Sequence, residues 1–141
     1  MRFKIGRVKI KISFSFFAVL TLLLAAEGGG AALVSLSCAM LHEMGHILAL
    51  LCFKSAPDEI YFGIFGVRIR QNKYALPCLK QAVTVLCGPL VNAVLFAFSL
   101  MAGFNCRGEL FFTFSAVNLV MGTFNMLPVL PLDGGLLLMI I

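Results

Sequence analysis

The stretch LHEMGHILAL, residues 41–50, places two histidines and a glutamate inside a run of apolar residues. Residues four apart lie on one face of an α-helix, so His42 and His46 can reach a single ion. Catalytic zinc takes three protein ligands, imidazole nitrogen among them, and keeps a water. Glu43 follows the first histidine and is placed to accept a proton from that water. The H-E-x-x-H pattern is the metalloprotease signature for this reason.

The surrounding chain is as apolar as a membrane protein. Its 141 residues are 61% hydrophobic and 12% charged, and the mean hydropathy is +1.04. A soluble domain carries about 25% charged residues, so lipid is the expected solvent. Ionisable groups at membrane depth are costly and usually functional, which favours a metal site over histidines that merely pack in a core. Gly45 removes a side chain between the histidines, so another backbone or a substrate can come close.

Four apolar segments predict an all-α membrane protein with about four transmembrane helices in one domain, residues 1–141. The segments span residues 12–26, 31–53, 82–104 and 110 onward. The first is short for a span of about 20 residues, so its basic N-terminal flank is expected to extend it by snorkelling. EGGG at 27–30 predicts a tight turn before the second segment.

Two breaks interrupt this helical pattern. Between the second and third segments, residues 59–70 are rich in β-branched and aromatic residues and predict a short strand or hairpin. The fourth segment is broken at NMLPVLPLDGG, residues 125–135, where prolines and glycines predict unwound backbone. In the third segment, Pro89 is expected to bend the helix or open it locally. The final LLLMII run predicts a helix cut short, and hence missing C-terminal segments.

A zinc site needs a third ligand, and Asp133 is the one carboxylate elsewhere at membrane depth. Asp-Gly is also a common turn signal, but inside an apolar run a ligand is the favoured interpretation. At 1.5 Å per residue, His42 lies roughly 16 Å from one membrane boundary and Asn92 roughly 15 Å from the other. Asp133 reaches a similar depth only if the break shortens its path.

Charge sets the orientation. Basic residues cluster before the first segment and in residues 54–81, while the other connections hold Glu27 and the pair Arg107 and Glu109. By the positive-inside rule, the N-terminus and the 54–81 loop are cytoplasmic, with the site in the inner half of the bilayer. The net charge of +5 does not indicate nucleic acid, because no basic stripe is interleaved with aromatics. The five cysteines lack C-x-x-C spacing and are interpreted as small buried thiols.

Three motifs in this order, HEMGH, GPLVN and NMLPVLPLDGG, resemble the site-2 protease family of intramembrane zinc metalloproteases. The resemblance covers residues 5–138, and EIYFGIFGVRI also resembles the subgroup related to stage IV sporulation protein FB. It implies an intramembrane zinc endopeptidase of a bacterial cytoplasmic membrane, with one Zn²⁺ per chain, acting in regulated intramembrane proteolysis. The implied substrate is a membrane-embedded or membrane-tethered protein, such as a transcription-factor precursor or an anti-sigma factor. Regulatory membrane proteins are further implied partners.

The resemblance also assigns roles by position. They are His42, His46 and Asp133 as zinc ligands, Glu43 as general base and acid, Gly88, Pro89 and Asn92 as substrate-facing residues, and Asn125 as part of the break before the aspartate. Asn92 is either a donor to the oxyanion or a polar helix-packing contact. Family members continue past LDGG with further helix, and PDZ and CBS modules are not found in this sequence.

Two other functions stay open. A membrane metal transporter would also place histidine and aspartate at membrane depth, but it predicts further ligands along a track, and one cluster is visible. A non-catalytic scaffold with a structural metal has no need of a free carboxylate beside its first ligand, so Glu43 argues against it. The residues 59–70 could also add a strand to an extended substrate.

Overall fold

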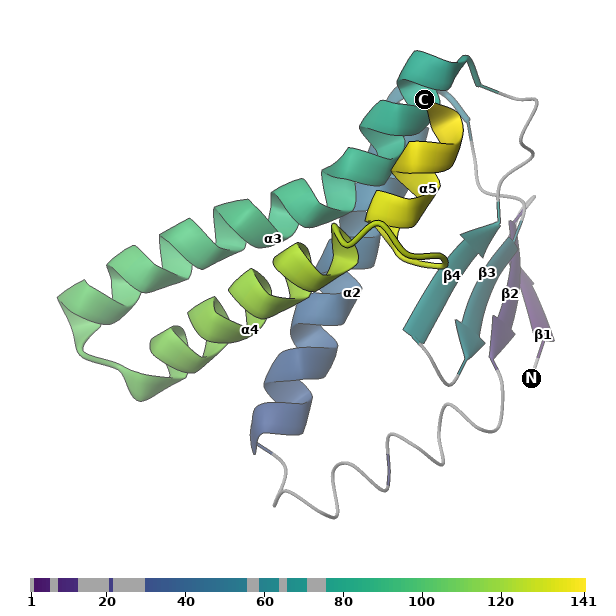
Figure 1. Cartoon of the computed structure of the whole chain (residues 1–141). Coiled ribbons are helices and arrows are strands. Elements are labelled where there is room, and N and C mark those ends of the chain that lie inside the picture. Colours follow the sequence, from purple (N-terminus) through teal and green to yellow (C-terminus); the bar gives the residue numbers. More distant parts are fainter. Residues whose placement is uncertain are drawn as a thin grey trace.

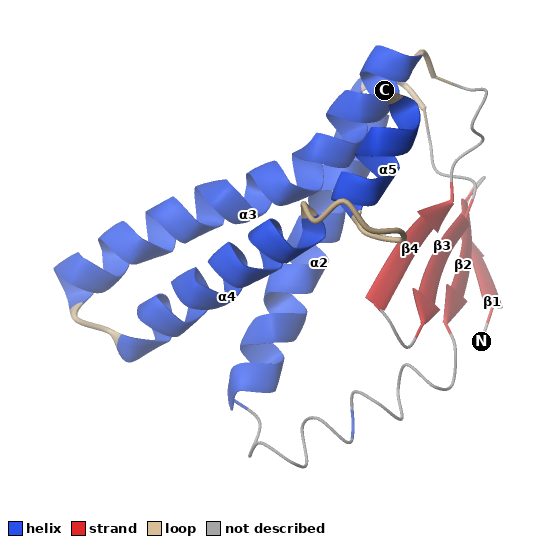
Figure 2. Cartoon of the chain, viewed as in Figure 1, coloured by secondary structure: helices blue, strands red, loops and turns tan. Residues whose placement is uncertain are grey.

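The computed structural model describes residues 2–5, 8–12, 21, 30–55, 59–63, 66–70 and 76–141. In chain order, the elements are β1 (Arg2–Ile5), β2 (Val8–Ile12), α2 (Gly30–Cys52), β3 (Glu59–Gly63), β4 (Gly66–Arg70), α3 (Cys78–Cys106), α4 (Glu109–Asn125) and α5 (Asp133–Ile140). The helices form one group and the strands form a sheet beside it (Figures 1 and 2). The chain is therefore mostly helical, as predicted.

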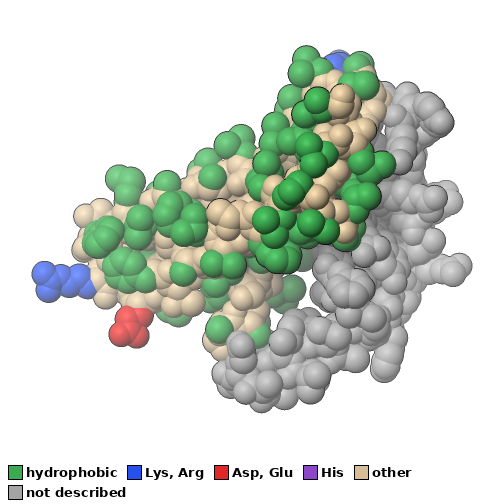
Figure 3. Space-filling model, in the orientation of Figure 1, with side chains coloured by type: hydrophobic (Ala, Val, Ile, Leu, Met, Phe, Trp, Pro, Cys, Tyr) green, Lys and Arg blue, Asp and Glu red, His purple; other side chains and the backbone are tan. Residues whose placement is uncertain are grey.

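Helices α2 and α3, with 23 and 29 residues, are long and apolar enough to cross a membrane. Only 28% and 17% of their most apolar 18-residue windows are buried, so most of this apolar surface faces outward, as a lipid-exposed surface does. Hydrophobic side chains cover the described helices on the face drawn in Figure 3. Helix α4 has 17 residues, fewer than the roughly 20 that a straight span needs.

The predicted count of four spans is only partly represented in the described residues. The first segment, residues 12–26, and the turn at 27–30 lie outside them, apart from residues 12, 21 and 30. The second and third segments correspond to α2 and α3, and α3 continues through Pro89 without interruption. The fourth segment is broken where the sequence predicts, since α4 ends at Asn125 and α5 begins at Asp133.

The all-α prediction is wrong for the N-terminal residues, because they form strands. The sheet has the order β1-β2-β3-β4, with β2 parallel to β3 and the other neighbouring pairs antiparallel. Strands β3 and β4 lie in the stretch where a hairpin is expected. Residues 8–12, VKIKI, alternate apolar and basic side chains, a period-two pattern typical of a strand, and this pattern outweighs their assignment as the basic flank of a span. Strand β4 contacts α2.

The bundle itself is held by close approaches of α2, α3 and α4. A Cβ at Gly45 would lie 2.7 Å from the Cys87 carbonyl oxygen, so the expectation that another backbone approaches at Gly45 is confirmed. The five cysteines are all free, as expected, but Cys38 alone is buried. The prediction of buried thiols is wrong for the three at helix ends, which are exposed: Cys52, Cys78 and Cys106.

Candidate metal centre

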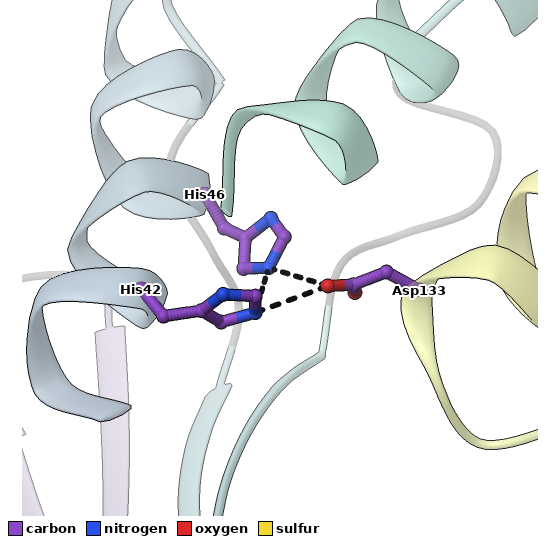
Figure 4. A group of neighbouring side chains, drawn as sticks. All are labelled: His42, His46 and Asp133. Carbon is purple, nitrogen blue, oxygen red and sulfur yellow. Dashed lines mark hydrogen bonds and ion pairs between the residues drawn. The ribbon is translucent and has the colours of Figure 1, made fainter. Parts of the chain in front are cut away.

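The structure brings His42 and His46 of α2 together with Asp133, the first residue of α5 (Figure 4). The two Nε2 atoms lie 3.2 Å apart. Asp133 Oδ2 lies 3.0 Å from His42 Nε2 and 3.4 Å from His46 Nε2. These three ligand atoms all lie within 4.8 Å of one another. Two segments separated by about 90 residues of chain thus converge on one point, as the depth argument required.

The hydrogen bonding of His46 shows which of its nitrogens faces this point. His46 Nδ1 lies 2.8 Å from the Thr84 carbonyl oxygen in α3. A carbonyl can only accept, so Nδ1 carries the hydrogen and Nε2 of the neutral ring keeps a lone pair. A metal-binding histidine has the same arrangement, with its second nitrogen donating to a carbonyl or carboxylate. His46 is therefore already in the ligand tautomer.

The space between these atoms also fits an ion. A Cβ added at Gly88 of α3 would overlap His46 Nε2 and lie 2.8 Å from His42 Nε2. Glycine leaves this position open beside both nitrogens. Two imidazoles and one carboxylate are a ligand set of catalytic zinc. Although both imidazoles are within ion-pair distance, Asp133 Oδ2 has no hydrogen-bond partner among the described residues, so a cation would satisfy it.

The double glycine after Asp133 explains how the aspartate reaches the histidines. A Cβ at Gly134 would overlap the Met126 carbonyl oxygen, and one at Gly135 would lie 2.5 Å from the Val129 carbonyl carbon. The first turn of α5 thus packs directly on the backbone of the preceding loop. This close packing shortens the path of the fourth segment and holds Asp133 beside the two histidines.

Glu43 and Asn125 lie outside the three-ligand group. Glu43 is half-buried on α2 and within electrostatic range of His46 and Asp133. Asn125 is half-buried at the last residue of α4, where the break begins. The structure therefore leaves Glu43 beside the ligands without making it one of them.

Asn92 lies one helical turn after Gly88 and is completely buried. Neither its Oδ1 nor its Nδ2 has a hydrogen-bond partner among the described residues. Helix α4 packs against it, since a Cβ at Gly122 would lie 3.2 Å from Asn92 Cβ. Pro89 is buried beside Gly88. A packing asparagine would be expected to bond to a neighbouring helix, and no such bond is found for Asn92 among the described residues.

Sequence reasoning missed two buried polar contacts, one at the centre and one a helical turn away from it. One is the Thr84 carbonyl, which no residue-type pattern reveals because every residue has a carbonyl. The other is Asn118 of α4, whose Nδ2 donates to Cys38 Sγ at 3.2 Å, one turn before His42 on α2. A buried asparagine in an apolar helix was a readable signal for the second contact.

Neither a protein-family profile nor a curated protein sequence matches the chain. Among solved structures, the chain is similar to the site-2 protease from Methanocaldococcus jannaschii, with a TM-score of 0.77. The two chains are 24% identical, and the alignment covers 98% of this chain and 69% of the other. The chain therefore has the site-2 protease fold. This is also the fold that the three sequence motifs predict.

Proposed function

We propose that the chain is an intramembrane zinc endopeptidase. The observation that carries the proposal is the convergence of His42, His46 and Asp133 on a point kept open by Gly88. The fold shared with a site-2 protease supports it. A zinc ion held by these three ligands would polarise the scissile carbonyl and bring the pKa of a water toward neutrality.

The remaining steps fall to side chains of this chain. Glu43, beside the ligands, accepts the proton of the attacking water and returns it to the departing amine. Asn92 offers an unpaired Nδ2 that can donate to the oxyanion. Its unpaired Oδ1 accepts from a backbone N–H of the unwound substrate. Pro89 and Asn125 belong to the walls of the same site.

The substrate that fits this site is a membrane-embedded or membrane-tethered protein whose helix unwinds locally, because an intact helix hides its carbonyls. We place the site in the inner half of a bacterial cytoplasmic membrane, with the 54–81 loop cytoplasmic, on the basis of charge. Strand β4 ends the order of the described sheet and contacts α2, so it is suited to pair with an extended substrate. The source of the substrate, a transcription-factor precursor or an anti-sigma factor in regulated proteolysis, belongs to the same proposal, as do a sporulation role and regulatory membrane partners.

The test is Glu43→Gln in the whole chain, with cleavage of a single-span membrane substrate and bound zinc both measured. Cleavage is expected to fall by about 10²–10⁴-fold, the usual contribution of a general base, while zinc is retained. Glu109→Gln makes the same chemical change at the exposed start of α4 and should leave both unchanged. Full cleavage by Glu43→Gln would rule out this mechanism.

The ligand set is tested separately by His42→Ala and Asp133→Ala. Each should lose zinc, because each removes one of three ligands. Zinc retained in Asp133→Ala alone would show that the third ligand is another group. Metal flux that survives Glu43→Gln would support a transporter instead.

A further inference from the structure

The Thr84 carbonyl fixes the tautomer of His46, yet it lies in the middle of a helix. In a regular helix each carbonyl accepts from the N–H four residues later and points along the axis. Such a carbonyl does not normally turn toward a neighbouring helix. The Thr84 oxygen nevertheless lies 2.8 Å from His46 Nδ1 on α2, so the local geometry of α3 needs an explanation.

The side chain of Thr84 is the first local cause. Its Oγ1 donates to the Lys80 carbonyl at 2.8 Å. This back-bond to the residue four earlier competes with the helical ladder and often bends the helix. The threonine is buried, and its hydroxyl donates within its own helix rather than to α2. Its side chain therefore acts on the course of the backbone.

Pro89 is the second cause, on the other side of the same carbonyl. Proline has no N–H, so the carbonyl of Val85, four residues earlier, loses its helical donor, and the proline ring crowds that oxygen. The disturbed carbonyl is adjacent to that of Thr84. The two bend-promoting groups thus enclose the turn that carries the acceptor of His46.

We propose that Thr84 and Pro89 are positioning residues for the metal ligand His46. In this proposal, the two residues distort the turn between them and so direct the Thr84 carbonyl to Nδ1, which holds the hydrogen there and leaves Nε2 free to bind metal. The expected effect on zinc affinity rests on the proposed zinc site, but the tautomer of His46 does not depend on zinc. Loss of such a partner typically lowers metal affinity about 10–100-fold.

The first measurement is made on the whole, metal-free chain with ¹⁵N-labelled histidine, at a pH about two units above the ordinary histidine pKa of about 6.5. The chain has two histidines, so in His42→Ala every remaining histidine signal comes from His46. We expect a protonated Nδ1 on His46 in the wild type. Thr84→Val and Pro89→Ala should shift His46 toward the Nε2-protonated form, and Thr84→Ser, which keeps the hydroxyl, should restore the wild-type spectrum.

The second measurement is zinc affinity by competition with a chromophoric chelator. Thr84→Val and Pro89→Ala should bind zinc about 10–100-fold more weakly. Ser99→Ala is the matched control, because Ser99 Oγ makes the same kind of back-bond to Leu95 at 2.6 Å in α3, away from the centre. Thermal unfolding of each variant confirms that it is folded.

The outcomes separate the two proposals. Wild-type spectra and affinity in both Thr84→Val and Pro89→Ala would overturn the positioning role while leaving the zinc site intact. An equal effect of Ser99→Ala would also overturn it. If the wild type holds the Nδ1 tautomer but binds no zinc, the proposed function fails and the positioning of His46 stands.

Discussion

The two halves of the α3–α4 pair treat buried polar groups in opposite ways. In the half away from the metal centre, Ser99 and Ser115 are 3% and 2% exposed. Each hydroxyl donates to a backbone carbonyl, at 2.6 Å and 3.3 Å respectively. At the metal end, Asn92 of α3 is completely buried and both of its amide atoms are unpaired among the described residues, as is His42 Nδ1 of the adjacent α2.

Under the proposed function, this difference separates structural polar groups from functional ones. A buried polar group without a partner destabilises a protein by about 1–3 kcal/mol. Such groups persist where a ligand uses them. In the far half, by contrast, the Ser99 hydroxyl is satisfied within its own helix and the Ser115 hydroxyl of α4 by the Phe96 carbonyl of α3. In an apolar chain, pairing is therefore a better guide to function than polarity alone.

The largest expected effect comes from a substitution that fills the open position at Gly88, beside the proposed metal ligands. Gly88→Ala places a methyl group on His46 Nε2 and 2.8 Å from His42 Nε2. Zinc affinity, measured by chelator competition, is expected to fall by more than about 100-fold, beyond the usual effect of losing a ligand's hydrogen-bond partner. The methyl group occupies space between the ligands that the ion needs.

Gly103→Ala is the matched change in the far half of the same helix. Its Cβ would meet the Phe112 ring at 3.1 Å, and a side chain can move aside at a cost of about 1 kcal/mol. Zinc affinity should stay at the wild-type value. An equal loss of zinc in both variants would mean that helix packing, rather than the open position at Gly88, controls the site.

The next effect concerns the unpaired amide. Asn92→Leu keeps the branched shape and removes both unpaired atoms, so the free energy of unfolding should be unchanged or rise by about 1 kcal/mol. Cleavage should fall about 100-fold, as when an oxyanion donor is removed, and zinc should be retained. Ser99→Ala should leave cleavage unchanged. A large loss of stability in Asn92→Leu would show that Asn92 is a packing residue.

Much of the site was predictable because its signals lie in residue types. A histidine pair at i, i+4 fixes its own geometry, and an aspartate in an apolar run stands out because lipid excludes it. The prolines and glycines around Asp133 marked the break that lets it reach the histidines. The Thr84 carbonyl was not predictable, since backbone contacts depend on the relative placement of α2 and α3. The N-terminal strands were visible in the alternation of VKIKI, but their basic residues equally fit the flank of a span.

The smallest expected effect concerns Asn118, and it tests how far the metal end of the α3–α4 pair extends along α4. Asn118 is completely buried, and its Nδ2 donates to the Phe114 carbonyl at 2.8 Å and to Cys38 Sγ at 3.2 Å, while its Oδ1 is unpaired among the described residues. Because its Nδ2 is paired, whereas neither amide atom of Asn92 is, we assign Asn118 to packing. A double-mutant cycle with Asn118→Ala and Cys38→Ala should give a coupling of about 0.6 kcal/mol, typical of polar contacts between membrane helices, with cleavage retained. If cleavage falls as far in Asn118→Ala as in Asn92→Leu, the functional region also includes Asn118 on α4. The unpaired Oδ1 of Asn118 would then serve the substrate.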